Sequence, residues 1–458
     1  MNREPRNAAK VQEPKERIKN FDEVSLGFDE ETMLLEADRC LNCKNAPCMK
    51  GCPVGVRIPE FISCLKNKDY DKAVDTIKAT NSLPAICGRV CPQEKQCESL
   101  CVRKAKLGGS VAIGTLERYV GDYSLAKGAK KSDVAKNGYK VAVVGSGPAG
   151  LSCAGALAKE GFDVTVFEAF HRAGGVLVYG IPEFRLPKDL VVEKEIEELR
   201  ALGVEIRLNT VIGKTITIDE LKEEYDAIFL GTGAGLPIFM GIKGEGLNGV
   251  YAANEFLTRV NLMKAYKQDS VTPVYCGKRV AVIGAGNVAM DACRTAMRLG
   301  AEHVYIIYRR GREEMPARAE EIEHAIEEGV ELKLLTNPVE ILGKDKVEGI
   351  RCIKMELGEP DQSGRRRPQE VKGSEFDIEV DEVIVSLGTS PNPLLKKSCE
   401  ELETSLKGTI VVNEETMETS LDSVYAGGDA VTGAATVILA MGAGKKAAKA
   451  ISDRLLCN

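Results

Sequence analysis

The sequence has little net charge and no segment that would direct the protein to a membrane or out of the cell. Its formal charge is −6 at pH 7, and Lys and Arg are dispersed apart from the runs at 309–310 and 365–367, which is atypical of nucleic-acid binding. No apolar core follows the first basic residues, so no signal peptide is predicted. The longest apolar stretch, 141–158, is interrupted by glycines and a proline, which disfavours a membrane span. We therefore expect a cytoplasmic protein without nucleic-acid or membrane partners.

Histidine is scarce, with three residues, but cysteine is not. Nine of the fifteen cysteines lie between Cys40 and Cys101. A disulfide framework is not expected in a chain without a secretory signal, whereas clustered thiols of this kind are typical of metal or iron–sulfur ligands. Structural zinc is the alternative, although these spacings are irregular and zinc sites usually draw on paired Cys and His residues.

The cysteines form two short runs on either side of a helical stretch. The runs are Cys40-x2-Cys43-x4-Cys48-x3-Cys52-Pro53 and Cys87-x3-Cys91-Pro92 with Cys97 and Cys101. Such runs resemble those of ferredoxins holding two clusters, in which the last cysteine of one run serves the other cluster. Between them, residues 59–78 are predicted to be helical, with Cys64 as a small buried hydrophobe. Residues 1 to about 35 are polar and are predicted to form an arm or short helices without chemistry of their own.

Residues 140–159 predict a strand, a tight turn and a helix. Gly145 permits the turn, Gly147 lets the backbone approach a pyrophosphate, and Gly150 lets the helix pack closely on the strand. Glu168 ends the next predicted strand about 20 residues further on, where a carboxylate binds a ribose hydroxyl. A glycine triplet alone is weak evidence, but the strands and the acidic residue together predict a dinucleotide site.

A second strand, turn and helix follow at residues 278–289, where Ala289 replaces the third glycine. The chain therefore carries two predicted dinucleotide folds. The offset that reaches Glu168 in the first unit leads here to a position just before Arg309 and Arg310. Paired arginines would bind a 2′-phosphate that a carboxylate would repel, so this site is predicted to prefer NADPH to NADH. The alternative is that both arginines lie at a solvated strand end.

The last part of the chain, residues 423–458, predicts a strand that ends near Gly428 and Asp429, followed by a terminal helix. This part is expected to belong to the first fold, which makes the second fold an insertion. Glu168 and Asp429 favour FAD in the first site, and two nucleotide sites in one chain imply a hydride relay.

Four features together resemble the family of NADPH-dependent glutamate synthase small subunits. They are the cysteine spacings, the glycine turn at 145–150, the sequence Gly-Ile-Pro-Glu-Phe-Arg-Leu-Pro at 180–187, and Ala-Gly-Gly-Asp at 426–429. The family includes the large subunit of NADH-dependent reduced ferredoxin:NADP oxidoreductase and the N-terminal half of dihydropyrimidine dehydrogenase. The resemblance covers essentially the whole chain.

The resemblance implies an α/β protein with two Rossmann-like domains, the NADPH domain inserted in the FAD domain, preceded by an α-helical domain that binds two [4Fe–4S] clusters. The expected domains are residues 1–137 for the clusters, 138–243 and 390–458 for FAD, and 244–389 for NADPH.

The resemblance also implies the site residues. One cluster is expected on Cys40, Cys43, Cys48 and Cys101, and the other on Cys52, Cys91, Cys97 and Glu117. Dihydropyrimidine dehydrogenase has glutamine at the position of Glu117, and counting thiols alone would select Cys87 instead. The expected FAD contacts are Gly145, Gly147, Pro148, Gly150, Glu168, Gly175, Arg185, Gly428 and Asp429. The expected NADPH contacts are Gly284, Gly286, Asn287, Ala289, Arg309 and Arg310.

The predicted function is that of an electron-input module, in which NADPH gives a hydride to FAD and the flavin passes single electrons through the clusters to a partner. Hydride transfer needs no catalytic acid or base. The implied partner is a second redox subunit: a glutamate synthase large chain or, as the alternative, the small flavin and iron–sulfur subunit of an electron-bifurcating ferredoxin:NADP oxidoreductase, with ferredoxin as a further option.

Two other classes compete with this prediction. A thiol–disulfide reductase has two similar folds but needs a cysteine pair beside the flavin, whereas Cys153 and Cys276 are solitary and Cys293 lies on a predicted helix. A scaffold that only binds nucleotides would explain neither the cysteine runs nor two sites of different preference.

Overall fold

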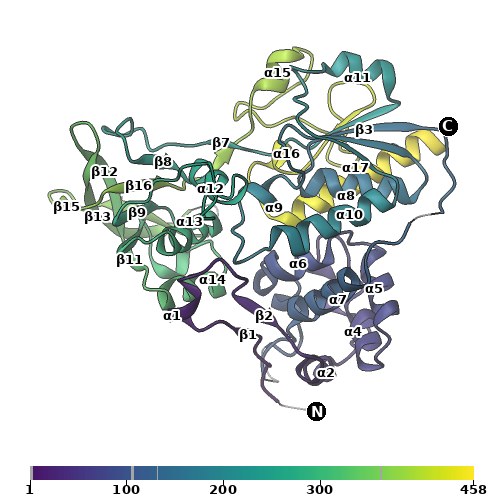
Figure 1. The fold of residues 1–458 in the computed structure, drawn as a ribbon, viewed down its shortest axis with the longest axis horizontal. Coiled ribbons are helices and arrows are strands. Elements are labelled where there is room, and N and C mark those ends of the chain that lie inside the picture. The colour runs from purple at the N-terminus through teal and green to yellow at the C-terminus, as the bar shows by residue number, and fades with distance from the viewer. Residues whose placement is uncertain (1–3, 105–107, 132, 362–363, 458) are drawn as a thin grey trace.

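Three bodies make up the computed structural model (Figure 1), which describes residues 4–104, 108–131, 133–361 and 364–457. A helical module comes first in the chain, a parallel sheet with long helices follows, and a second parallel sheet with an antiparallel extension is inserted in it. The helical module and the first sheet share one apolar core, and the second sheet has a core of its own. The chain is therefore organised around two α/β folds with the cysteine-rich module attached to the first.

The helical module is built from short helices joined by cysteine-bearing loops. Its elements are β1 (Lys10–Val11), α1 (Pro14–Arg17), β2 (Ser25–Gly27), α2 (Glu30–Asp38), α3 (Pro47–Lys50), α4 (Ile58–Lys66), α5 (Tyr70–Lys78), α6 (Pro84–Val90) and α7 (Ile113–Lys127), with 3-10 turns η1 (Gln93–Lys95) and η2 (Glu98–Leu100). The helical stretch predicted at 59–78 is two helices, because the chain turns at Lys68, whose φ is +56°.

Two glycines bring α6 and α7 into close contact. A Cβ atom on Gly121 would lie 2.5 Å from the backbone of Ala85, and one on Gly88 would lie 2.4 Å from the backbone nitrogen of Arg118. Only glycine fits at such a distance, so the helix that precedes Cys91 is held directly against the helix that carries Glu117.

The first sheet is parallel, in the order β18-β6-β3-β4-β5. Its strands are β3 (Lys140–Val144), β4 (Asp163–Phe167), β5 (Glu205–Arg207), β6 (Ala227–Leu230) and β18 (Val424–Ala426). Its helices are α8 (Pro148–Lys159), α9 (Val176–Tyr179), α10 (Glu193–Ala201), α11 (Ile218–Glu224), α15 (Leu394–Ser398), α16 (Asp429–Thr432) and α17 (Val437–Leu456), with a π-helical turn η3 (Lys188–Val192) before α10. Because β18 pairs with β6, the end of the chain returns to the first sheet.

The second sheet repeats the arrangement, in the order β11-β10-β9-β16-β8. Its strands are β8 (Val250–Ala252), β9 (Arg279–Ile283), β10 (His303–Tyr308), β11 (Glu331–Leu334) and β16 (Glu382–Val385). Its helices are α12 (Ala253–Asn261), α13 (Asn287–Arg298) and α14 (Ala319–Glu327), with a 3-10 turn η4 (Arg312–Glu314). Both sheets bury valine and isoleucine on their central strands, as expected for parallel sheets covered on both faces.

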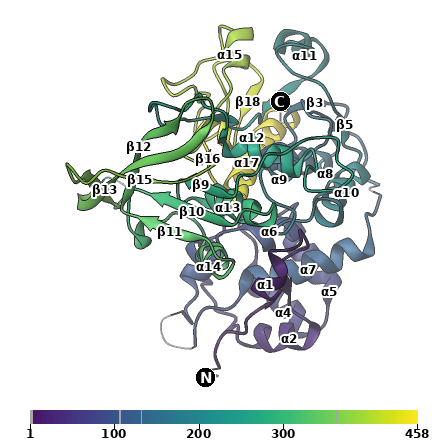
Figure 2. The same cartoon turned by 60° about the vertical axis from the view of Figure 1, so that its left-hand side comes forward.

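An antiparallel meander extends from the second sheet and points away from the first (Figure 2). Its strands are β12 (Thr336–Gly343), β13 (Val347–Pro360), β14 (Arg366–Glu370) and β15 (Phe376–Ile378). The two α/β folds are joined by a two-stranded antiparallel ribbon of β7 (Leu236–Pro237) and β17 (Thr389–Ser390). The second fold is thus an insertion whose two connections run side by side.

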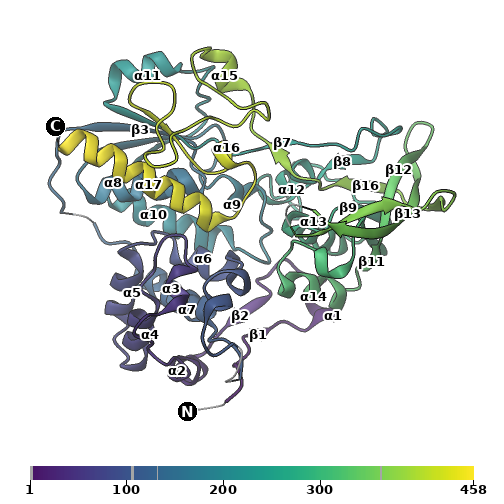
Figure 3. The same cartoon turned by 180° about the vertical axis from the view of Figure 1, so that it is seen from behind.

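The N-terminal arm crosses from the helical module to the second fold, where α1 lies beside α14 in Figures 1 and 3. The long helix α17 packs along α8 and reaches α6 of the helical module (Figure 3). A Cβ atom on Gly444 of α17 would lie 2.0 Å from the carbonyl oxygen of Ala149, so the two helices meet at backbone distance.

Candidate functional site

Four of the predicted cluster ligands meet on one side of the helical module. The cysteines Cys40, Cys43, Cys48 and Cys101 line one small cavity together with apolar side chains. They come from three loops: after α2, around α3 and after η2. Burial raises the pKa of the Cys48 thiol to about 11 and also raises that of Cys40, so binding as thiolates requires a cation to offset the lost solvation. This group is called the first cysteine set below.

The remaining predicted ligands form a second group deeper in the protein. Burial is the main reason that the pKa values of the Cys52 and Cys97 thiols are raised, and the nearby Glu117 and Cys91 raise both further. The group consists of Cys52 from the loop after α3, Cys91 at the end of α6, Cys97 from the turn between η1 and η2, and Glu117 from α7. They are called the second cysteine set.

Cys87 lies beside the second set, and Asn81 contacts both it and Glu117. The Asn81 amide nitrogen donates to Glu117 Oε1 at 2.8 Å, while its oxygen accepts from the Cys87 thiol at 3.7 Å. Burial raises the pKa of Glu117 to about 7, and Cys91 raises that of Cys87. The structure therefore places both alternatives for the fourth ligand at the second set.

The donor sets fit four-iron clusters, in which each ligand binds a separate iron. Four cysteine sulfurs line the cavity of the first cysteine set, and three cysteine sulfurs with one carboxylate form the second set. Within the part of the chain that the structure describes, no group of three or more His, Cys, Asp or Glu side chains is drawn together tightly enough to hold a single metal ion.

A cavity of about 510 Å³ lies at the carboxyl ends of the first sheet, where ligands bind in open α/β folds. Seven of the nine predicted FAD contacts line it: Gly145, Gly147, Pro148, Glu168, Gly175, Arg185 and Asp429. The other two, Gly150 and Gly428, pack behind its wall. A Cβ atom on Gly150 would lie 1.9 Å from the carbonyl oxygen of Gly145, and one on Gly428 would lie 2.9 Å from the Ala149 side chain.

The glycine turn leaves room for a phosphate. Gly145 has a φ of +97°, and a Cβ atom on Gly147 would meet nothing within 4 Å, so the backbone is open to the cavity there. The first turn of α8 follows, with unpaired N–H groups facing the same space. The predicted dinucleotide cradle is present.

The two acidic residues predicted to contact FAD, Glu168 and Asp429, are buried or partly buried and hydrogen-bonded. Glu168 accepts from the Ser146 backbone at 3.1 Å and from the Phe170 backbone at 2.8 Å, and it also contacts the Ser146 hydroxyl. Asp429 accepts from the Ala435 backbone at 3.2 Å, and burial raises its pKa. These bonds hold the two carboxylates at opposite parts of the cavity wall.

The second fold repeats the glycine geometry. Gly284 has a φ of +125°, and a Cβ atom on it would lie 2.4 Å from the carbonyl oxygen of Ser386, while a Cβ atom on Gly286 would meet nothing within 4 Å. Asn287 is the first residue of α13, and its side-chain oxygen accepts from the Arg318 backbone at 2.9 Å. Ala289 is fully buried.

The two predicted phosphate-binding arginines differ. Arg309 is exposed just after the end of β10. Arg310 is buried, donating to the Arg366 carbonyl oxygen at 2.9 Å and forming an ion pair of 2.9 Å with Asp361. Arg310 therefore ties β10 to the antiparallel meander, and its predicted contact with a 2′-phosphate stays a prediction.

The cavity of about 510 Å³ lies where the helical module and the two α/β folds meet. Asn287 and Asp291 of α13 line it from the second fold, while Val90 and Pro92, which flank Cys91, line it from the helical module. Within the described residues no cysteine lines this cavity. A cofactor in it would contact the second nucleotide fold on one side and the residues that flank Cys91 on the other.

Two family descriptions match the chain. The description "dihydropyrimidine dehydrogenase domain II, 4Fe-4S cluster" matches residues 17–129, and "pyridine nucleotide-disulphide oxidoreductase" matches residues 139–447. The second match covers more than half of the chain, so the two α/β folds are those of a pyridine-nucleotide-dependent flavin oxidoreductase, here preceded by an iron–sulfur module.

Curated relatives narrow the class. The chain is 38% identical to the glutamate synthase (NADPH) small chain of Escherichia coli K12 over 460 residues, which is 97% of each chain. It is 40% identical to the NADP(+)-dependent formate dehydrogenase subunit beta of Moorella thermoacetica over 90% of this chain and 60% of that one. The chain therefore belongs to the glutamate synthase small-chain family. It is an NADPH-dependent flavin and iron–sulfur oxidoreductase whose cofactors are FAD, NADPH and [4Fe–4S] clusters, as the sequence resemblance predicted.

A solved structure agrees on the fold. Mycobacterium tuberculosis FprA in complex with NADPH superposes with a TM-score of 0.58 over 70% of this chain and 84% of that one, at 23% identity. This similarity concerns the fold alone. Among the described residues, every helix is too short or too polar to cross a membrane.

The sequence prediction overlooked one set of residues that line or support the cavity. Asp291 of α13 pairs with the predicted FAD contact Arg185, and Phe184 next to it packs under arginines of the same helix. Their signal was present, because Asp291, Arg294 and Arg298 recur at helical spacing on one face of an otherwise apolar helix.

Proposed function

We propose that the chain is the electron-input subunit of a larger redox complex. NADPH binds the second fold and gives a hydride, which carries two electrons, to FAD in the cavity at the first sheet. The oxidised nucleotide then leaves as NADP⁺. Electrons then pass one at a time to a cluster on the second cysteine set, to a cluster on the first set, and to a partner. The chain's own part is to bind and align the two nucleotides and to hold the clusters in series.

The position of Cys91 carries this proposal. Its neighbours Val90 and Pro92 line the flavin cavity, while α17 contributes Ala440 to that cavity and Met441 to a 3.5 Å contact with the thiol of Cys87. The second set therefore adjoins the flavin site, whereas the first set lies towards the outer surface of the helical module. This order makes the first set the exit.

The exit surface is apolar, which fits a partner subunit with a redox centre of its own. Leu41, Leu100 and Val102 line the cavity of the first set and are 38%, 45% and 46% exposed. Exposed apolar side chains gathered at one place are typical of protein–protein interfaces. The relatives named above are a small chain and a subunit beta, which supports a complex in this protein as well.

Within this proposal, the predicted residues take their assigned roles. Two clusters are held by the two sets, with Glu117 as the carboxylate ligand. The nucleotide contacts are those predicted from the sequence, except that Arg310 is assigned to the contact between β10 and the antiparallel meander. The domain boundaries 1–137, 138–243, 244–389 and 390–458 and the cytoplasmic location stay predictions. As partner, we propose a glutamate synthase large chain, with the small subunit of a ferredoxin:NADP oxidoreductase as the alternative.

Removing Cys91 tests the order of the centres. Anaerobically purified wild-type protein should hold about eight irons and eight sulfides, and NADPH should reduce the flavin and both clusters. Cys91→Ser should lose or alter only the second cluster. NADPH should still bleach its flavin, but the first cluster should be reduced far more slowly because its nearest donor is missing, while dithionite should reduce it normally. Electron paramagnetic resonance during an NADPH titration reports each cluster.

Cys64→Ser is the matched control, because Cys64 is a buried thiol of the same module outside both sets. It should keep both clusters and wild-type electron flow. If the first cluster of Cys91→Ser fills with electrons from NADPH as fast as in the wild type, the series order is wrong. Stoichiometric zinc without sulfide in the wild type would contradict the cluster assignment altogether.

A further inference from the structure

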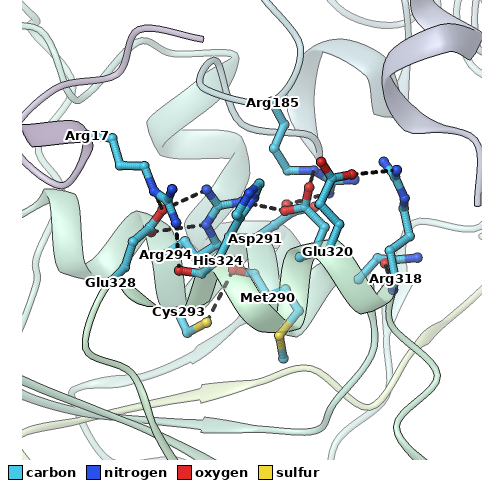
Figure 4. A network of polar contacts seen from close by, with 12 residues as sticks. Arg17, Arg185, Met290, Asp291, Cys293, Arg294, Arg318, Glu320, His324 and Glu328 are labelled. Carbon is cyan, nitrogen blue, oxygen red and sulfur yellow. Dashed lines mark hydrogen bonds and ion pairs between the residues drawn. The ribbon is translucent and has the colours of Figure 1, made fainter. Parts of the chain in front are cut away.

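The loop at residues 180–187 binds helix α13 of the second fold through a buried ion pair. Arg185 Nη1 donates to both carboxylate oxygens of Asp291, at 2.6 and 2.7 Å, and Arg185 Nε lies 3.1 Å from Glu321 Oε1 on α14 (Figure 4). The Arg185 and Asp291 side chains are 7% and 4% exposed. The loop belongs to the first fold, so this contact joins the two nucleotide-binding folds.

A second contact reinforces the first. Phe184 is fully buried, and the guanidinium groups of Arg294 and Arg298 lie 4.8 and 3.9 Å from its ring centroid. Stacked guanidinium groups on an aromatic face are attractive, more so when desolvated. The backbone oxygen of Phe184 accepts from the Val24 backbone at 2.9 Å, which adds the N-terminal arm to the junction.

The same helix makes further buried contacts through Arg294. Arg294 donates to Glu328 at 2.7 and 3.0 Å, and Arg17 of the arm donates to Glu328 at 2.7 Å. The Arg17 side chain is fully buried. Figure 4 shows Arg17 and Arg185 approaching the α13 and α14 pair from different segments of the chain. Helix α13 is thus fixed relative to both the flavin fold and the arm.

The ion pair lies at the wall of the flavin cavity. Arg185 and Asp291 both line that cavity, as does Asn287 in the first turn of α13. The N-terminus of α13 follows the glycine turn that cradles the second nucleotide. A small rotation of α13 would therefore change the position of this nucleotide relative to the flavin.

Stability does not account for the charge on Asp291. Burial raises the pKa of Asp291 to about 6 although Arg185 and Arg294 lower it. At neutral pH the ionised carboxylate is thus less favourable in the fold than in water. Buried ion pairs often contribute little to stability and instead select one geometry.

We propose that the Arg185–Asp291 pair is a positioning contact that holds α13, and with it the nicotinamide, at the flavin, so that it governs the rate of hydride transfer rather than the affinity for either cofactor. The inference rests on the proposed placement of FAD and NADPH. If that placement is wrong, NADPH fails to reduce the flavin of the wild type, a result separate from any effect of the variants.

Asp291→Asn is the primary test, because it removes the charge and keeps the shape. Flavin reduction is followed by stopped flow under anaerobic conditions at increasing NADPH concentration. The limiting rate should fall by about 10-fold to 100-fold, the range in which misplacement of reacting groups slows catalysis. The NADPH concentration for half-maximal rate and the FAD content should stay as in the wild type.

Arg185→Lys is the conservative second variant. One nitrogen, Nη1, makes both contacts with Asp291, so a lysine ammonium can replace them but not the Nε contact with Glu321. Its limiting rate should lie between those of the wild type and Asp291→Asn. Asp377→Asn is the matched control, because Asp377 forms an exposed ion pair with Arg351 at 2.8 Å in the same inserted segment, and its rate should equal that of the wild type.

Two readouts separate positioning from a structural role. Hydrogen exchange of oxidised protein without NADPH should rise at residues 180–187 in Asp291→Asn, because the loop loses its anchor. The thermal midpoint should not fall below that of the Asp377→Asn control. A lower midpoint with loss of FAD would show a structural role and overturn the proposal.

The pH dependence gives an independent check. Asp291 is faced by Arg185 from the loop, Arg294 from its own helix, Glu321 from α14 and Lys188 from η3. Protonation of Asp291 as the pH falls through about 6 removes the charge that pairs with Arg185, so the wild-type limiting rate should drop there and that of Asp291→Asn should not. A rate equal to wild type in the variant, or a change in NADPH affinity alone, would refute the positioning role.

Discussion

Asn81 is the residue on which the chemistry of the second cysteine set depends. It is fully buried, donates to Glu117 Oε1 and accepts from both the Cys87 thiol and the Leu83 backbone. With Oε1 engaged in this way, the other carboxylate oxygen of Glu117 is the one available to an iron. The Cys87 thiol contacts Asn81 and Met441 and also interacts with Cys91, so Glu117 stays the predicted fourth ligand and Cys87 the alternative.

Glu117→Gln should keep the second cluster and raise its reduction potential, because a neutral ligand removes negative charge from around the irons and so favours the reduced form. A redox titration followed by electron paramagnetic resonance measures this shift. Cys87→Ser is the control and should leave iron content and potential unchanged. Loss of iron in Cys87→Ser with an unchanged potential in Glu117→Gln would instead make Cys87 the ligand.

Residue by residue, the sequence predicted what spacing and chemistry define locally. The cysteine runs and the glycine turns could be recognised from local spacing, whereas the division of the cysteines between two clusters came from the family resemblance alone. The pair of Arg185 and Asp291 could not, because 106 residues separate them and either charge alone is an ordinary surface residue. Only the packing of the inserted fold brings them together.

At the scale of elements, strand β10 and the antiparallel meander form a unit around Arg310. Its guanidinium binds the Arg366 carbonyl oxygen and Asp361, so it holds the β13 and β14 strands against the end of β10. Arg309, its neighbour, is exposed and stays the predicted contact of a 2′-phosphate. Sequence adjacency suggested one role for both arginines, but beyond the end of β10 the chain buries Arg310 and leaves Arg309 exposed.

Substitutions of the two arginines should therefore have different effects, one on nucleotide binding and the other on stability. Arg309→Ala should weaken NADPH binding by about 1.5–3 kcal/mol, the value of a hydrogen bond to a charged group, and leave NADH binding nearly unchanged. Arg310→Ala should instead lower the free energy of unfolding by about 1–3 kcal/mol through the bonds it leaves unmade. Equilibrium titrations with both nucleotides and denaturant unfolding distinguish the two outcomes. Equal losses of NADPH and NADH affinity in Arg309→Ala would show that Arg309 does not read the 2′-phosphate.

At the scale of the whole molecule, the N-terminal arm makes buried contacts with the second fold that its polar sequence did not indicate. It was predicted to have no chemistry of its own, yet Arg17 is fully buried against Glu328 of the second fold, and Phe21 stacks on Tyr266 at 4.4 Å. The arm thereby links the iron–sulfur module to the inserted fold. The sequence could not reveal the role of Arg17, because its partners Glu327 and Glu328 lie more than 300 positions away.

The exit surface gives the prediction that concerns the molecule as part of a complex. Val102→Glu places a charge beside the first cysteine set, where Val102 is 46% exposed among apolar side chains. Reduction of the flavin and the second cluster by NADPH should be unaffected, because Val102 lines the cavity of the first set and not the flavin cavity. Binding of the partner subunit should weaken by about 2 kcal/mol or more, as for other central interface positions.

Val271→Glu is the matched control, since Val271 is 98% exposed on the inserted fold, away from the first set. Co-purification from the native cell identifies the partner, and titration of the purified partner compares the two variants. A large glutamine-amidotransferase chain with FMN would support the glutamate synthase assignment, whereas a small flavoprotein with a [2Fe–2S] centre would support the ferredoxin-linked alternative. If Val102→Glu binds either partner as tightly as Val271→Glu does, electrons leave the molecule through another face.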